Sequence, residues 1–182
     1  DYAGSEWRIG DTLQAAIGQS DSVFTPLQLA EYCAAVANNG ERHSASILKS
    51  VRSYDYSEQI YDRQDEVLST VESPQYNWDA IHEGMRLVLN DPMNETNYLN
   101  FYDCAVTVAG KTGTAQKGEG IKNDGLFICY APYEDPEIAV AVVVERGHAG
   151  ASVGFIARQI VDVYLNIRSY SNTSESEMSL LK

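Results

Sequence analysis

The stretch from residue 106 to residue 116 constrains this chain more than any other. Its first residues alternate β-branched and small side chains, which predicts a β-strand. Four residues then follow consecutively: Lys111, Thr112, Gly113 and Thr114. The lysine supplies a fixed positive charge, the threonines supply hydroxyl donors, and the glycine lets a ligand lie close to the backbone. The stretch therefore predicts a strand that holds an anionic ligand.

The string Gly110-Lys111-Thr112 also matches the end of a phosphate-binding loop. That loop requires a glycine five positions before Gly110 and a helix directly after the threonine. Position 105 is Ala105, and residues 115–120 are a poor start for a helix. Nucleotide binding is therefore disfavoured. A solvent-facing edge strand with an unrelated lysine remains an alternative on Lys-Thr-Gly alone.

Length and charge narrow the function classes. The chain has 182 residues, which is enough for one domain with a real core. Its formal net charge of −13 argues against nucleic acid and anionic membrane surfaces as partners. The longest apolar run, residues 138–144, is far too short to span a bilayer. The polar start shows no signal peptide, and we expect the chain to be part of something larger.

The cysteines and histidines suggest neither disulfides nor a metal. The three cysteines form no Cys-x-x-Cys pair and lie among apolar neighbours, so we expect buried free thiols. The three histidines lack metal-ligand spacing. We therefore expect no metal and no cofactor.

Helices are predicted at three places. Thr25 is an N-cap followed by Pro26, and Gln28 completes a capping box for a helix that ends at Asn39-Gly40. A second helix over residues 78–89 contains Gly84, where we expect a close backbone approach. A third follows residues 147–150, with an apolar face formed by Val153, Ile156, Ile160, Val163 and Ile167.

The rest divides into strands and irregular segments. We expect a solvent-facing ribbon formed by residues 47–54 and 59–71. We also expect two further strands of an antiparallel meander, over residues 125–131 and 138–145, and the second of these should be buried on both faces. Residues 10–18 match neither helix nor strand clearly. We expect a polar loop over 91–104 and a disordered tail over 169–182.

Longer strings resemble one family. Two stretches are similar to class B penicillin-binding transpeptidases. The first is residues 109–116, Ala-Gly-Lys-Thr-Gly-Thr-Ala-Gln, and the second is the set of spaced residues from Gly10 to Gly40, including Thr25-Pro26-Leu27-Gln28. Ser20 stands where the family usually has glycine. The resemblance implies an α+β penicillin-binding/β-lactamase-like fold, in which an antiparallel sheet is covered by helices. Residues 1–168 would form the C-terminal portion of the transpeptidase domain.

Two of the family's three active-site elements are not recognised here. The family uses a Ser-x-x-Lys that carries the nucleophile, a Ser-x-Asn, and the Lys-Thr-Gly strand. The 182 residues contain no Ser-x-Asn. Ser-x-x-Lys occurs at Ser46 and Ser179, but neither occupies the family's position for the nucleophile. The resemblance implies that the nucleophile lies in sequence upstream of Asp1, so this chain alone would be inactive.

The resemblance assigns roles to the central strand. Lys111 would set a positive potential and bond to the Ser-x-Asn element, while the Thr112 and Thr114 hydroxyls would hold the substrate carboxylate. The Thr114 backbone N–H would be one of two oxyanion donors. Gly113 would let substrate lie along the strand edge as an added β-strand.

The resemblance also implies partners and a location. The complete enzyme would cross-link peptidoglycan stem peptides ending in D-Ala-D-Ala, and β-lactams would acylate the same serine. It would act at the extracytoplasmic face of the bacterial membrane. A non-catalytic peptide-binding scaffold of the same fold remains the alternative. Without the family's upstream strands, we expect the isolated chain to dimerise through residues 138–145 or to be marginally stable.

Overall fold

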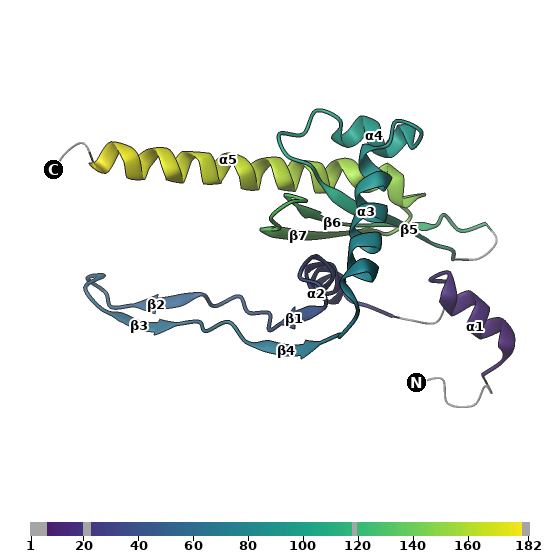
Figure 1. Cartoon of the computed structure of the whole chain (residues 1–182), viewed down its shortest axis with the longest axis horizontal. Coiled ribbons are helices and arrows are strands. Elements are labelled where there is room, and N and C mark those ends of the chain that lie inside the picture. Colours follow the sequence, from purple (N-terminus) through teal and green to yellow (C-terminus); the bar gives the residue numbers. More distant parts are fainter. Residues whose placement is uncertain (1–6, 20–22, 118–119, 180–182) are drawn as a thin grey trace.

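A three-stranded antiparallel sheet forms the centre of the fold. This computed structural model describes residues 7–19, 23–117 and 120–179, with side chains to residue 166. The sheet has the order β5 (Ala109–Ala115), β6 (Asp124–Ala131) and β7 (Ile138–Val144) (Figure 1). All neighbours are antiparallel, which confirms the predicted meander. β5 and β7 are therefore the two edges.

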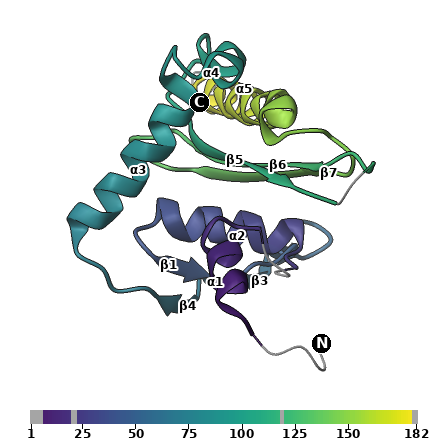
Figure 2. The same ribbon diagram turned by 90° about the vertical axis from the view of Figure 1, so that its right-hand side faces the viewer.

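Helices cover both faces of this sheet. In Figure 2, α2 (Pro26–Ala37) lies on one face, and α4 (Glu95–Phe101) and α5 (Gly154–Ser179) lie on the other. α3 (Gln75–Asn90) contacts β5 and α4. One core cluster includes Phe101, Phe127 and Val161, and the other includes Cys33 and Tyr130. The predicted α+β class is confirmed.

The first strongly predicted helix forms as its sequence indicates. The Thr25 hydroxyl accepts a bond from the Gln28 N–H at 3.2 Å, and the Gln28 side chain accepts from the Thr25 N–H at 2.9 Å. The helix buries Cys33 and Val36 against the sheet. This reciprocal cap fixes where α2 begins.

A two-stranded ribbon projects from the body. β1 (Glu41–His43) pairs with β4 (Val67–Thr70), and β2 (Ser50–Arg52) pairs with β3 (Gln59–Asp62) (Figure 1). The predicted solvent-facing ribbon is confirmed, but its bounds differ. The predicted strand over residues 47–54 contains only β2, the one over 59–71 is divided into β3 and β4, and β1 lies outside both. Both pairings contain a register shift, which explains why the ladders are short.

Several local predictions are wrong. Residues 9–16 form helix α1 (Ile9–Ala16), whose first turn is capped by Asp11 accepting from the Arg8 N–H at 2.7 Å. Residues 95–101 form α4 rather than a loop, because the Phe101 ring stacks on the Phe127 ring, with the two ring centroids 5.7 Å apart. A Cβ on Gly84 would meet nothing within 4 Å among the described residues, so the expected close backbone approach is not found there.

The last helix also differs from its prediction. Of the predicted apolar face, Val153 is buried and Ile156 packs against the core, whereas Ile160 and Val163 are exposed. Ala157 and Val161 are buried in their place, and Ile167 lies outside the described side chains. η1 (Gly150–Val153), a 3-10 turn, leads into α5. α5 continues to Ser179, so its backbone is helical where a disordered tail was predicted. Each residue added to an existing helix gains a hydrogen bond, which favours extension. The division at residue 168 remains a prediction.

β7 is less buried than its apolar sequence suggests. Val140 and Val142 are buried, while Val143 is exposed. The prediction of burial on both faces therefore holds only in part, since β7 is an edge strand. Within the described residues, no helix is long and apolar enough to cross a membrane.

Candidate active site

The predicted site residues lie on an exposed edge of the sheet. Lys111, Thr112, Gly113 and Thr114 all belong to β5, and β6 is its only strand partner among the described residues. Lys111 is exposed, and the next three residues are half-buried. The Lys-Thr-Gly stretch therefore faces solvent and does not lie in the interior.

Two carbonyls show which way the free edge points. The Thr114 carbonyl accepts a hydrogen bond from the Gln19 side-chain amide at 2.8 Å, and the Thr112 carbonyl accepts from Lys111 Nζ at 2.7 Å. A strand residue points its N–H and C=O to the same side. The N–H groups of Thr112 and Thr114 therefore also point to the free edge, while Lys111 and Gly113 pair inward with β6.

The turn before α5 supports Thr114 from the side. The Gly150 N–H donates to the Thr114 hydroxyl oxygen at 3.3 Å. A Cβ on Gly150 would lie 2.3 Å from the Leu126 carbonyl oxygen and 2.5 Å from the Gly113 carbonyl oxygen. Only glycine allows η1 to lie this close to β5 and β6. Because the Thr114 oxygen already accepts a bond, its proton is left to donate elsewhere.

Gly113 has a packing role that the sequence did not indicate. A Cβ there would meet the Leu126 Cβ at 3.2 Å, which is tighter than ordinary contact. Glycine thus keeps β5 close to β6 at this position. Open access of a ligand to the Gly113 backbone remains a prediction.

A charged pair closes the β5–β6 hairpin beyond the Lys-Thr-Gly stretch. Lys117 Nζ lies 2.7 Å from an Asp124 carboxylate oxygen, and the other oxygen accepts from the Arg146 N–H at 2.9 Å. The bond from Lys117, then that from Arg146, holds the pKa of Asp124 below its ordinary value. The same bond raises the pKa of Lys117. Lys117 is therefore engaged with Asp124, whereas Lys111 stands at the strand edge.

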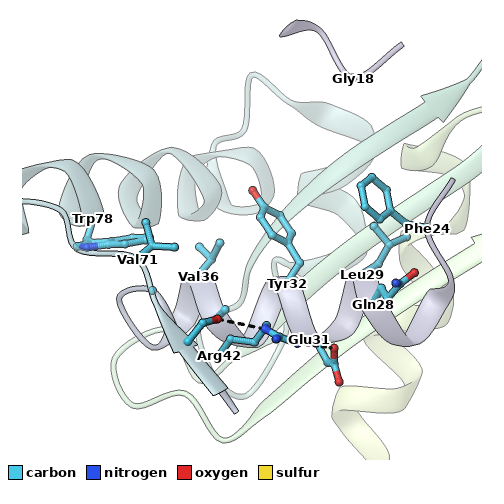
Figure 3. Close-up of a pocket in the computed structure, with 13 residues that line it drawn as sticks. Gly18, Phe24, Gln28, Leu29, Glu31, Tyr32, Val36, Arg42, Val71 and Trp78 are labelled. Atoms are coloured by element: carbon cyan, nitrogen blue, oxygen red, sulfur yellow. Dashed lines mark hydrogen bonds and ion pairs between the residues drawn. The ribbon is translucent and has the colours of Figure 1, made fainter. Parts of the chain in front are cut away.

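A sizeable pocket lies away from this strand. It has a volume of about 660 Å³ and lies beside Tyr32 of α2 and Phe24, which precedes that helix, with Trp78 at its far end (Figure 3). Its polar residues bond to one another: Arg42 lies 3.8 Å from Glu31 and donates to Ser69 at 3.3 Å. None of the predicted site residues lines it. We assign it no chemistry.

The two Ser-x-x-Lys matches are not brought to β5. Ser46 lies at the exposed ribbon, where its hydroxyl accepts from the Leu48 N–H at 3.1 Å. Together with Lys49 it lines a separate charged hollow on that ribbon. Ser179 ends α5, and its side chain lies outside the described part.

Sequence reasoning missed Gln19 and Gly150 as neighbours of Thr114. Gln19 follows a glycine that ends α1, and Gly150 lies in a Gly-His-Ala-Gly string, so both had local signals of a turn. Neither signal indicates the partner, because the contacts span 95 and 36 residues.

Comparison with known proteins identifies relatives. The family model described as "Penicillin binding protein transpeptidase domain" matches residues 2–162. The chain is 32% identical over 179 residues to peptidoglycan D,D-transpeptidase MrdA of Haemophilus influenzae, covering 89% of this chain and 27% of that protein. It is 30% identical over 174 residues to penicillin-binding protein 2B of Streptococcus pneumoniae, covering 90% and 25%.

Solved structures give the same result. Penicillin-binding protein 2B of Streptococcus pneumoniae matches with a TM-score of 0.77 and 29% identity, covering 89% of this chain and 28% of that one. The imipenem acyl-enzyme complex of penicillin-binding protein A from M. tuberculosis matches with a TM-score of 0.70 and 29% identity, covering 84% and 33%. The chain spans about a quarter of the length of the curated relatives that it matches.

Proposed function

Because the chain belongs to the penicillin-binding protein transpeptidase family, we propose that it supplies the Lys-Thr-Gly wall of a D,D-transpeptidase active site. The observation that carries this proposal is the free edge of β5. The exposed Lys111 lies there beside outward-pointing N–H groups of Thr112 and Thr114. Such an edge suits an anion: a terminal carboxylate or a developing oxyanion.

The proposed reaction is acyl transfer through serine. The nucleophile's hydroxyl oxygen attacks the carbonyl carbon between the two D-alanines of a stem peptide, and its proton passes to a base. The C–N bond then breaks, and the terminal D-alanine leaves with a proton on its nitrogen. An amine of a second stem peptide attacks the acyl-serine, forms the cross-link and frees the serine.

Each residue of the wall has a part in this scheme. Lys111 contributes positive potential, and the hydroxyls of Thr112 and Thr114 donate to the substrate carboxylate. The Thr114 N–H is one oxyanion donor, and the nucleophile's own N–H is the other. Loss of one such donor typically lowers the rate about 10²–10³-fold. A substrate strand alongside β5 would pass Gly113.

The proposed nucleophile belongs to the family's upstream portion, which this chain would complete. The family resemblance and the lack of a Ser-x-Asn in the 182 residues support this view. The proposed location is the extracytoplasmic face of the bacterial membrane, where peptidoglycan is cross-linked. β-Lactams would acylate the same serine.

Labelling with a fluorescent penicillin tests the function. We expect the full-length parent to form a covalent adduct, the Lys111→Ala variant to lose it, and the 182-residue chain alone to form none. Lys122→Ala, at a lysine in the turn between β5 and β6, is the matched control and should label normally. A wild-type parent without label would reject the proposal, and a labelled isolated chain would show that the nucleophile is misplaced.

The second candidate function is a non-catalytic peptide-binding scaffold. It is favoured by the same lack of a Ser-x-Asn. The residues encoded upstream of Asp1 decide between the two, because a Ser-x-x-Lys and a Ser-x-Asn there would reject the scaffold.

We also propose that the isolated chain either dimerises through β7 or is only marginally stable. This strand is a sheet edge with an exposed Val143, and exposed apolar edges recruit other strands. Light scattering and calorimetry test this. A monodisperse monomer that melts at high temperature would contradict it.

A further inference from the structure

We propose that Gln19 determines specificity, because its side-chain amide occupies the Thr114 carbonyl to which a ligand's own amide must bond. A ligand with such an amide has to displace Gln19, whereas a ligand without one binds with this contact intact. The inference rests on the proposed function of the β5 edge. It adds selection among ligands by a residue outside the Lys-Thr-Gly stretch.

The end of α1 brings Gln19 to the strand. Gly18 has a φ of +78°, and its N–H donates to the Ala15 carbonyl at 3.0 Å, while the Gln19 N–H donates to the Gln14 carbonyl at 2.9 Å. These two bonds and the left-handed glycine form a Schellman motif, which fixes the backbone of Gln19. Only the half-buried side chain of Gln19 reaches the edge, where its amide donates to the Thr114 carbonyl at 2.8 Å. A rotation of this side chain is therefore enough to free the carbonyl.

A peptide paired with this edge uses both backbone groups of Thr114. In a hydrogen-bonded antiparallel pair, the two facing residues exchange both of their N–H···O=C bonds. In the proposed function, the carbonyl of the first of the two D-alanines lies on the Thr114 N–H. The N–H of that same D-alanine then points to the Thr114 carbonyl, which already accepts from Gln19. The peptide and Gln19 therefore compete for one acceptor.

This competition discriminates between ligands by a single group. Penicillin G carries a side-chain amide next to its lactam carbonyl, and the N–H of that amide corresponds to the N–H of the D-alanine. Penicillanic acid has a hydrogen atom in place of this side chain and contains no N–H. A neutral hydrogen bond has a net value of about two- to tenfold in an equilibrium constant. Gln19 should therefore weaken the binding of penicillin G by that factor and leave the binding of penicillanic acid unchanged.

Three variants of the full-length parent test the role of Gln19. Gln19→Leu removes the amide at similar size, and Gln19→Asn withdraws the amide from the carbonyl on a side chain one methylene shorter. Gln64→Leu is the matched control, since the Gln64 amide also donates to a backbone carbonyl, that of Asp62, at 3.4 Å, but on the exposed ribbon. Acylation by penicillin G and by penicillanic acid is followed by intact-protein mass spectrometry over a range of ligand concentrations. The curves give an initial dissociation constant and a first-order acylation rate for each ligand.

We expect Gln19→Leu and Gln19→Asn to lower the initial dissociation constant for penicillin G about two- to tenfold, because the ligand no longer has to displace Gln19. The first-order rate should stay unchanged, since the displacement is complete once the ligand is bound. Both constants for penicillanic acid should stay unchanged, and Gln64→Leu should alter neither ligand's constants. Equal changes for both ligands overturn the proposal, because they indicate a general disturbance of the edge. Unchanged or weaker binding of penicillin G in the Gln19 variants also overturns it, because the Thr114 carbonyl would then accept both amides or Gln19 would hold the ligand.

Crystal structures of the wild-type parent give a second measurement that needs no variant. Gln19 should bond to the Thr114 carbonyl before acylation, and the ligand amide should replace it after acylation by penicillin G. A Gln19 bond retained in that adduct overturns the proposal. A wild-type parent that takes neither ligand rejects the proposed function and this selectivity together, whereas an acylated parent with unaltered selectivity in the Gln19 variants rejects the role of Gln19 alone.

Discussion

Replacing Gly150 by alanine tests how closely η1 lies against the site strand. A Cβ at this position would lie 2.3 Å from the Leu126 carbonyl oxygen, and 2.5 and 2.6 Å from the carbonyl oxygen and nitrogen of Gly113. These are backbone atoms of two paired strands, so they cannot rotate away. Because carbon–oxygen contacts normally exceed roughly 3.3 Å, η1 must move by about 1 Å.

That shift has two calculable costs. Overpacking a well-packed site costs about 1–3 kcal/mol. Lengthening the 3.3 Å bond between the Gly150 N–H and the Thr114 hydroxyl beyond bonding distance costs about 1 kcal/mol more. We therefore expect Gly150→Ala to lower the free energy of unfolding by about 2–4 kcal/mol.

Urea unfolding with and without the substitution measures this change, and Gly84→Ala provides the control. Gly84 is an exposed residue inside α3, and its added Cβ would meet nothing within 4 Å. Helix propensity then predicts a gain of about 1 kcal/mol. The two alanine substitutions should have opposite signs. A Gly150→Ala protein within about 0.5 kcal/mol of wild type would refute the close approach of η1 to the sheet.

Three further outcomes are expected. Arg158 contacts two carboxylates at 2.7 and 2.8 Å with a side chain only 16% exposed, so Arg158→Met should lower the free energy of unfolding by about 1.5–3 kcal/mol. Arg86→Met, at a pair that is more accessible to solvent, should cost under about 1 kcal/mol by the same urea assay. The pKa of Asp124 is lowered from 3.8, so the ionised carboxylate stabilises the fold above about pH 4, and this stabilisation is lost as the pH falls through the lowered pKa. The melting temperature of Asp124→Asn should therefore fall less between pH 5 and pH 2.5 than that of wild type. Iodoacetamide followed by mass spectrometry should modify the half-buried Cys104 first in the native protein and all three cysteines after unfolding, since the other two are fully buried.

The elements with strong local signals were predictable. The capping box at Thr25 and Gln28 fixed the start of α2, and the apolar run over residues 138–144 identified β7. The Lys-Thr-Gly stretch identified the strand that carries the candidate site. In each case the deciding information lies within a few residues, which is the range over which caps and strand alternation act.

Predictions failed where distant contacts decide the outcome. α4 forms in a polar segment because Phe101 packs on Phe127, which lies in β6. The open space that a Cβ on Gly84 would enter, in the part of the chain that the structure describes, depends on how α3 crosses the other elements. The exposed Ile160 shows that an apolar repeat does not fix which stripe of α5 faces the sheet. Tertiary packing overrides local preference at these positions.

The chemistry of the site edge also depends on residues outside its motif. Taken alone, a Lys-Thr-Gly strand at a sheet edge alternates N–H and C=O groups, and such an edge recruits another strand. Here the two outward carbonyls accept from Lys111 and from Gln19, which is 95 residues away, and the Thr114 hydroxyl oxygen accepts from Gly150. With those acceptors occupied, the free groups at this edge include the N–H donors of Thr112 and Thr114 beside a positive charge, which suits a carboxylate or a developing oxyanion. The motif supplies the groups, but the turns at the end of α1 and before α5 determine which of them remain free.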